Sequence, residues 1–332
     1  QAQLLTAEGN HEGAYRALTD AARRAPNDPT ILYWTGRAQI YLEQPDGAVE
    51  SFRRAAALDP RWASPVGQLA GAYDRLGRYQ DAIPAREREI SLMSQPDPWS
   101  YVFQAASYLL WRADTAAARQ MLERGDPRTV VDALTWAVWI PQAGRAIWMD
   151  LVPPAVRTAK DTLTLAGYMA ANWGTVTPDG YHFMKAAHFA LTGRREQARA
   201  HADSVIALLE PELRRSPGAT SFSFFGHSRQ TTLAEAYAYA GRAGDAARLI
   251  DKYVENVRGD RNGPGGRPTS SAFVAAAYVD VLIGRPDSAV ARLTEALRRP
   301  TGQWISRPLL RADPSWAPLR GRPDFERLIA DR

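Results

Sequence analysis

Seven alanines recur along the chain in the same kind of surroundings, and this recurrence limits the fold more than any other feature. A turn, usually containing glycine, lies five or six residues before each of them. The alanines are Ala14, Ala48, Ala82, Ala117, Ala198, Ala246 and Ala289. The first three are 34 residues apart, which is the period of a helix–turn–helix repeat. The pattern predicts an elongated surface that holds a ligand, without indicating which ligand.

The chain has 332 residues, no cysteine and an apolar fraction of 45%. A repeat array grows along one axis, so this length fits a single long array. The lack of cysteine excludes disulfides, thiolate metal sites and a cysteine nucleophile. The longest apolar stretches, such as 273–283, are too short and too interrupted to cross a bilayer.

The formal net charge of +5 is a small surplus of 41 basic over 36 acidic residues. Because nucleic-acid binding requires a much denser basic surface, we expect no nucleic-acid partner. Most of the surplus lies from Arg298 onward, where the sequence has eight arginines and four acidic residues. This basic end is either a solvated end of the array or a docking patch for an acidic protein or anionic lipid headgroups. The candidate contacts of such a patch are Arg320 and Arg322.

Two consecutive units carry the repeat most clearly. The unit at 29–62 contains Gly36, Ala48, Phe52, Ala55 and Asp59-Pro60, and the next contains Leu69, Tyr73, Gly77, Tyr79 and Ala82. Small side chains allow two antiparallel helices to approach to about 8–10 Å, while the larger ones fill the space toward the next unit. Proline cannot continue the second helix and therefore ends it. These positions resemble the tetratricopeptide repeat.

The resemblance implies an all-α, right-handed superhelical solenoid of about sixteen helices with a C-terminal capping helix. We expect a block of about four repeats at 1–131, a degenerate tryptophan-rich segment at 132–178, about three repeats with two loop insertions at 179–303, and a capping segment at 304–332. Within the last segment, Phe325, Leu328 and Ile329 fall on one face of a short helix that begins near Pro323. The tail from Asp313 to Leu328 also resembles the one that closes the repeat regions of bacterial serine/threonine kinases and related multidomain regulators.

Tryptophans gather in the degenerate segment between the two blocks. Trp136, Trp139 and Trp148 lie there among prolines and a glycine that interrupt helices. The indoles either fill space where regular packing fails or form an aromatic patch for a partner.

A catalytic constellation is missing from the sequence. We find no phosphate-binding glycine loop, no kinase signature, no nucleophile elbow and no zinc-protease helix. His182 and His188 point about 240° apart on a helix, whereas His188 and His201 could meet across a hairpin, where a pair is usually structural. Acids such as Glu87, Glu89, Glu210 and Glu212 lie in charged stretches and are expected to face solvent. We therefore expect no enzyme, no metal and no cofactor.

In tetratricopeptide arrays the first helix of each repeat lines the concave groove, so the resemblance implies a binding face. Its candidate residues are Tyr33, Arg37, Tyr41, Arg75, Trp99, Phe183, Glu235, Tyr239 and Tyr278. About half of them are expected to pack against neighbouring helices instead. Repeats that clamp the carboxyl terminus of chaperones use lysine and asparagine where Gly67 and Gly71 stand, so that use is disfavoured.

These observations predict a non-catalytic scaffold for a protein or peptide partner, resembling the regulatory or sensor region of a bacterial signalling protein. The alternative is an accessory structural subunit of a larger assembly, with contact to a membrane surface through the tryptophan-rich segment and the basic end. An enzyme or small-molecule binder is a third reading. Gln1 falls inside the first expected helix, which favours a fragment of a longer chain over a matured exported protein. The compartment, bacterial cytoplasm or periplasm, stays open.

Overall fold

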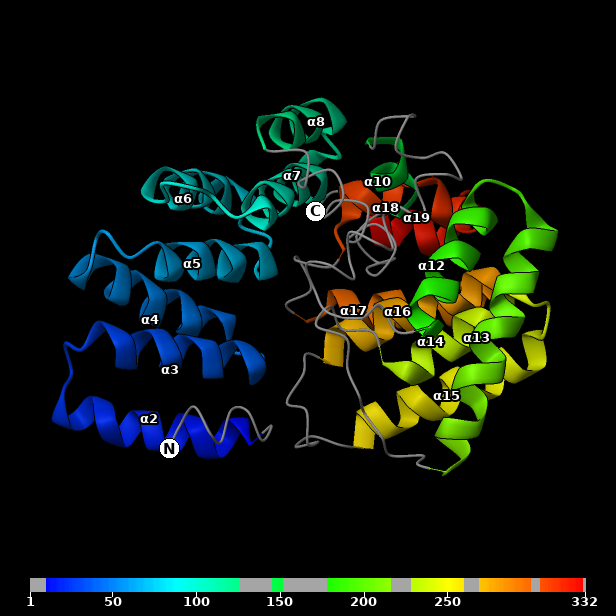
Figure 1. Ribbon diagram of the computed structural model, residues 1–332, viewed down its shortest axis with the longest axis horizontal. Coiled ribbons are helices and arrows are strands. Elements are labelled where there is room, and N and C mark those ends of the chain that lie inside the picture. Colours follow the sequence, from blue (N-terminus) through cyan, green and yellow to red (C-terminus); the bar gives the residue numbers. More distant parts are fainter. Residues whose placement is uncertain are drawn as a thin grey trace. The chain divides into compact units, whose positions relative to one another are not determined.

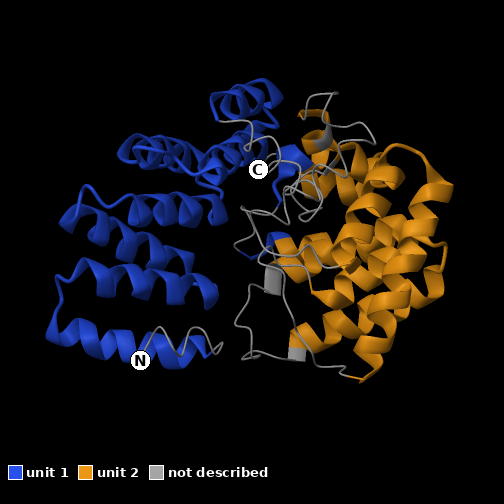
Figure 2. Ribbon diagram, in the orientation of Figure 1, with its two compact units in different colours: residues 1–129, 260–270, 297–309 blue, residues 130–259, 271–296, 310–332 orange. Residues whose placement is uncertain are grey.

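The computed structural model describes residues 10–125, 145–151, 178–215, 228–259, 269–299 and 305–330. In these ranges the chain forms sixteen α-helices and one short 3-10 helix, and no β-strand is among the described elements (Figure 1). The expected all-α fold is confirmed. The chain divides into two compact units, which Figure 2 colours separately.

The first unit comprises residues 1–129, 260–270 and 297–309. Its helices are α2 (His11–Arg24), α3 (Pro29–Tyr41), α4 (Pro45–Leu58), α5 (Ala63–Arg75), α6 (Tyr79–Leu92), α7 (Pro98–Arg112) and α8 (Thr115–Arg124). Each helix packs against the next along the chain. The segment 297–309, far away in sequence, joins them: Ser306 hydrogen-bonds with the phenol of Tyr79, and Arg299 lies 3.8 Å from the carboxylate of Glu43.

The second unit comprises residues 130–259, 271–296 and 310–332. Its helices are α10 (Arg145–Leu151), α12 (Pro178–Leu191), α13 (Arg195–Arg215), α14 (Arg229–Tyr239), α15 (Ala243–Gly259), α16 (Thr269–Leu282), α17 (Pro286–Leu297), α18 (Arg307–Ala312), η2 (Pro314–Leu319) and α19 (Pro323–Ile329). Helices α16, α17 and α18 each have some residues that the division assigns to the first unit. Among the pairs in contact are the consecutive helices α12 to α15.

A left-handed residue in each hairpin turn fixes the register of the repeat. Gly77, Gly193, Gly241 and Gly284 all have positive φ, and each lies five residues before a buried alanine. A positive φ costs glycine little, because it has no Cβ to collide with the backbone. In the hairpins α3–α4 and α7–α8 the left-handed residues are Glu43 and Ala113 instead.

One of the seven expected core alanines is wrong by one position. Ala118 is fully buried, whereas Ala117 is partly exposed. Ala118 lies five residues after the left-handed Ala113, just as Ala82 lies five residues after Gly77 and Ala198 five after Gly193. The register shifts because α7 has 15 residues where α5 has 13, so the distance from Ala82 is 36 residues rather than 34 or 35. The other six alanines are buried as expected.

The core of the first hairpins follows the repeat pattern. Phe52 on α4 is fully buried together with Ala48 and Ala72, and Tyr33 and Leu69 pack against this cluster. Gly36 on α3 faces the Phe52 ring so closely that an added Cβ would lie 2.6 Å from a ring carbon. The glycine therefore lets the two helices close on the phenylalanine.

An equivalent hydrogen bond, from an arginine to a proline carbonyl, connects each of two consecutive repeats to the turn before it. Arg54 donates to the carbonyl oxygen of Pro26 at 2.9 Å, and Arg88, 34 residues later, donates to that of Pro60 at 3.5 Å. Helix beginnings are capped by aspartates in several places, as Asp28 shows by accepting from the backbone N–H of Thr30.

The expected C-terminal capping helix is confirmed as α19. Phe325 and Ile329 are buried, and Arg311 donates to the carbonyl oxygen of Ile329. Before it, the Asp313 side chain caps η2, and the fully buried Trp316 meets Tyr278 edge-on with 6.0 Å between ring centroids. The aspartate, tryptophan and phenylalanine of the tail thus all have structural contacts.

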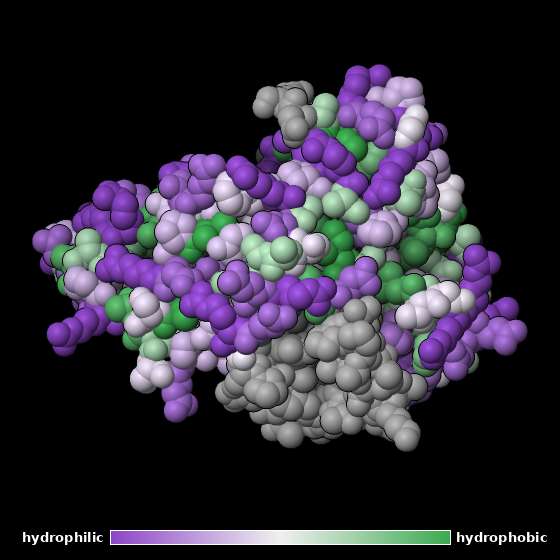
Figure 3. Space-filling model, turned by 90° about the horizontal axis from the view of Figure 1, so that it is seen from above, coloured by the Kyte–Doolittle hydropathy of each residue, from purple (hydrophilic) through white to green (hydrophobic). Residues whose placement is uncertain are grey.

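Polar residues dominate the face of the molecule in Figure 3, with hydrophobic residues in smaller patches between them. Across the described ranges, none of the helices has the length and apolar character needed to span a membrane.

Candidate functional site

Aromatic rings and a guanidinium gather on the first helix of the hairpin α3–α4. We call Tyr33, Trp34, Arg37 and Trp62 the Tyr33 cluster; all four side chains are partly exposed. The Tyr33 ring centroid lies 4.9 Å from that of Trp62 and 5.4 Å from that of Trp34. The Arg37 guanidinium carbon lies 4.9 Å from the Trp34 ring centroid, within cation–π range. Two of the predicted site residues, Tyr33 and Arg37, therefore belong to one cluster.

A second, more polar group lies at the end of the same helix. The Tyr41 ring stacks on that of the buried His11, with 4.2 Å between centroids and 11° between planes. Desolvation lowers the pKa of Arg75 to about 10, and the nearby Glu43 and Tyr41 oppose this shift. Tyr41 and Arg75, predicted from two different repeats, thus act on each other electrostatically.

The other predicted groove residues are buried to different degrees. Trp99 on α7 is partly exposed and lies near Phe103, with 5.9 Å between ring centroids. Phe183, Glu235 and Tyr278 are 0%, 2% and 3% exposed, so they pack within the second unit. Tyr239 is partly exposed and donates its hydroxyl proton to the Glu235 carboxylate. The binding role of the nine residues stays a prediction.

The candidate partner patch is only partly described. Trp136 and Trp139 lie outside the described residues, and Trp148 on α10 is fully buried. Arg320 is exposed but donates to the backbone carbonyls of Arg311 and Asp313 at 3.0 and 3.1 Å.

The other arginine of that patch is paired with acids of its own unit. Arg322 hydrogen-bonds with Asp324 and Asp287, and both bonds raise the pKa of its guanidinium. The basic end is therefore partly neutralised within the chain, and its role as a docking patch stays a prediction.

A buried ion network in the first unit escaped the sequence analysis. The Arg86 guanidinium on α6 lies 3.1 Å from the Asp74 carboxylate on α5 and 3.5 Å from that of Glu89. Ser107 on α7 donates to Asp74 at 2.8 Å, so the network joins three helices. Burial raises the pKa values of Asp74 and Glu89, and Arg86 opposes both shifts. The expectation that Glu89 faces solvent is wrong, since only 12% of its side chain is exposed.

The repeat spacing contains the signal that could have found this network. Arg86 and Glu89 lie 34 residues after Phe52 and Ala55, two buried residues of the preceding repeat. Gly67 makes room for the carboxylate, because a Cβ there would lie 2.0 Å from an oxygen of Glu89. In this chain Gly67, at a position where chaperone-clamping repeats have a polar side chain, therefore serves the packing of α5 against α6.

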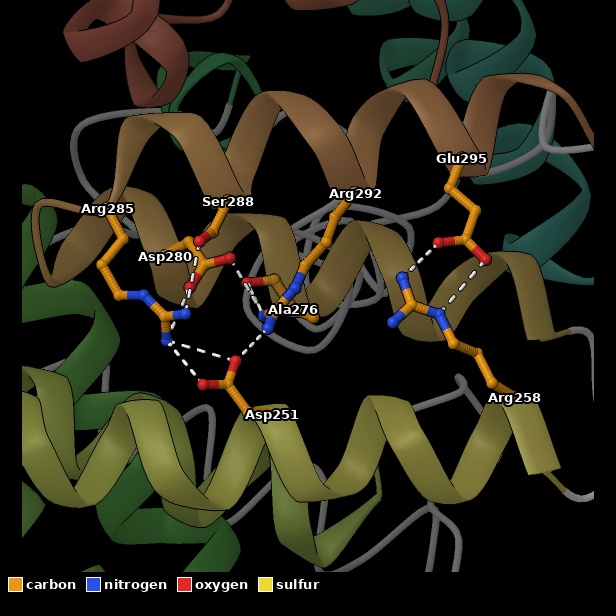
Figure 4. A network of polar contacts seen from close by, with 8 residues as sticks. All are labelled: Asp251, Arg258, Ala276, Asp280, Arg285, Ser288, Arg292 and Glu295. Atoms are coloured by element: carbon orange, nitrogen blue, oxygen red, sulfur yellow. Dashed lines mark hydrogen bonds and ion pairs between the residues drawn. The ribbon is translucent and has the colours of Figure 1, made fainter.

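A second ion network joins three helices of the second unit (Figure 4). On α16, the Asp280 carboxylate is fully buried and lies 2.9 Å from the Arg292 guanidinium of α17 and 3.5 Å from that of Arg285. Both arginines also pair with Asp251 on α15. Desolvation raises the pKa of Asp280 to about 6, although Arg292 and Arg285 oppose the shift.

Two histidines of the second unit meet across the hairpin α12–α13. The Nδ1 atoms of His182 and His201 lie 2.9 Å apart, so the partner of His201 is His182. The expected pairing of His188 with His201 is wrong. His182 lies seven residues before Phe189, whose ring stacks on His201, so both occupy the face toward α13. His188 is rotated about 100° from that face.

The described ranges contain no cluster of three or more histidine and acidic residues able to hold a metal ion. Asp74, Arg86, Glu89, Asp280 and Arg292 take part in ion networks that join helices.

No family model matches the sequence. The small glutamine-rich tetratricopeptide repeat-containing protein 2 of Mycosarcoma maydis is 29% identical over 101 residues, 28% of this chain and 28% of that protein. A protein of Saccharomyces cerevisiae, essential for maintenance of the cell wall protein 1, is 25% identical over 120 residues, 35% of this chain and 13% of its own length. The chain thus matches less than a third of either curated relative.

A solved tetratricopeptide repeat protein of Parabacteroides merdae is 12% identical, with 90% of both chains covered and a TM-score of 0.38. In the chain itself, paired helices, turns with a left-handed residue and buried alanines recur in one register. In these features, and in its similarity to the relative from Mycosarcoma maydis, the chain resembles proteins built of tetratricopeptide repeats.

Proposed function

We propose that the chain is a non-catalytic scaffold that holds a protein or peptide partner on the Tyr33 cluster. The observation that carries this proposal is the gathering of two tryptophans, a tyrosine and an arginine, all partly exposed, on the first helix of one hairpin and the residue before the next. Tryptophan, tyrosine and arginine are the residue types that dominate binding energy at protein interfaces. Tetratricopeptide-type repeats also serve protein interaction, which supports the same role.

Charge reversal at Arg37 tests the cluster. We expect Arg37→Glu to weaken partner binding about tenfold or more, because it removes the cation from the aromatic rings and places an anion beside them. The affinity is measured with the partner that co-purifies from the native source, while circular dichroism confirms unchanged helix content.

The matched control is Arg53→Glu, the same charge change on the second helix of the hairpin, where the arginine is 61% exposed and pairs with Glu50. Its partner affinity should stay within about twofold of the unchanged chain. Equal losses in both variants, or none in Arg37→Glu, would remove the cluster from the binding site.

The scaffold is further proposed to be the regulatory portion of a bacterial signalling protein. Support comes from the tail, whose Asp313, Trp316 and Phe325 match the resemblance and have defined contacts around the capping helix. The alternative of an accessory structural subunit relies on the basic end as a contact surface. Because Arg320 and Arg322 bond within their own unit, the first reading is preferred.

A further inference from the structure

The histidine pair of the second unit is joined by a hydrogen bond between two ring nitrogens. Two ring nitrogens, Nδ1 of His182 and Nδ1 of His201, face each other at 2.9 Å from two different helices. Neighbouring aromatic rings hold both imidazoles: Tyr181 lies edge-on to them at 5.3 and 6.4 Å between centroids, and Phe189 stacks on His201 at 5.6 Å. The two nitrogens are thereby kept close to each other.

The separation of the nitrogens matches one kind of coordination geometry. With metal–nitrogen bonds of about 2.0–2.1 Å, two nitrogens 2.9 Å apart subtend an angle of about 90° at a shared ion. This is the angle between neighbouring ligands in square-planar and tetragonal complexes, which Cu²⁺ and Ni²⁺ prefer. The tetrahedral angle that Zn²⁺ prefers is wider. In the structure the two nitrogens share a hydrogen bond, so binding an ion requires both rings to turn and the shared proton to move to the Nε2 atom of its ring.

The charge of Lys185, one turn after His182, acts on both imidazoles. The same positive charge repels a bound cation, which limits the affinity of the site.

We propose that His182 and His201 form a two-imidazole site for Cu²⁺ or Ni²⁺, with water in the remaining positions. Both residues are partly exposed, so an ion can reach them from solvent. The site is independent of the Tyr33 cluster, which lies in the other unit, so either proposal can fail without the other.

Copper itself is the first probe. One equivalent of CuCl₂ is added to the full chain, and electron paramagnetic resonance counts the coordinated nitrogens. Two imidazole nitrogens are expected. A spectrum with one imidazole nitrogen or none would overturn the proposal without any substitution.

Substitutions then assign the ligands. His182→Ala and His201→Ala should each weaken Cu²⁺ binding by at least about tenfold, measured by isothermal titration calorimetry. The matched control is His188→Ala, on the same helix but rotated off the pair, and its affinity should stay within about twofold. Copper binding that survives both His182→Ala and His201→Ala would contradict the site.

Lys185 gives a test of opposite sign. Lys185→Gln removes the neighbouring positive charge and leaves a polar side chain one atom shorter, so Cu²⁺ should bind more tightly. A merely structural histidine pair has no reason to show this gain. Weaker copper binding in Lys185→Gln would count against the proposal.

Discussion

Replacing Arg86 with methionine is expected to lower the free energy of unfolding by about 3–5 kcal/mol. The guanidinium is 5% exposed and stands between two carboxylates, those of Asp74 and Glu89. Methionine fills much of the same volume but leaves both acids buried without the guanidinium that pairs with them. The folded state must then keep two uncompensated charges or take up protons. Urea unfolding followed by circular dichroism measures the loss.

The control for this experiment is Arg53→Met on α4, the corresponding helix of the preceding repeat. Arg53 is 61% exposed and pairs with Glu50, which is 56% exposed, so its loss should cost at most about 1 kcal/mol. The same chemical change thus has very different effects at two positions of the repeat array. If Arg86→Met were as mild as Arg53→Met, the network would not contribute to the stability of the first unit.

Arg292→Met should destabilise the second unit by a similar amount, about 3–5 kcal/mol near neutral pH. The fully buried Asp280 would keep only Arg285, 3.5 Å away, as a close cation. Asp280→Asn added to Arg292→Met should recover at least half of the loss, because no carboxylate then remains stranded. If the double variant were as unstable as the sum of both single variants, the two side chains would not interact.

The pH dependence of Arg292→Met follows from the pKa of Asp280. In the folded chain this pKa is raised to about 6 from an ordinary value of 3.8, so the folded state binds the proton more tightly than the unfolded state. Stability from this group is therefore fully present below about pH 3.8 and is lost as the pH rises through about 6. Without Arg292 the pKa rises further, so the variant should lose stability more steeply with rising pH than the unchanged chain.

The helical hairpins could be predicted because turns and cores leave local signals. Glycine adopts a left-handed conformation easily, and Gly77, Gly193, Gly241 and Gly284 mark four turns that the sequence analysis had identified. Ala117 was misassigned because the length of α7 cannot be read from the spacing of alanines when Ala118 stands beside it. Single positions thus remain ambiguous where neighbouring residues are alike.

The buried charges could not be predicted from local pattern alone. The run Arg86 to Glu89 alternates in sign, which is typical of a solvent-facing helix, yet Arg86 and Glu89 occupy positions that are apolar in the preceding repeat. Their burial depends on partners in other helices, such as Asp74 and Ser107. The histidine pair is similar, because only the packing of α12 on α13 brings His182 rather than His188 to His201.

Site-specific photocrosslinking tests the proposed binding face most directly. A benzoylphenylalanine is placed at Arg37 in one variant and at Arg53 in another, and each full chain is irradiated in its native cells. The account predicts a crosslink to another protein from position 37, within the Tyr33 cluster, and none from position 53 on the second helix of the same hairpin. Crosslinks from position 53 alone, or equally from both positions, would contradict it.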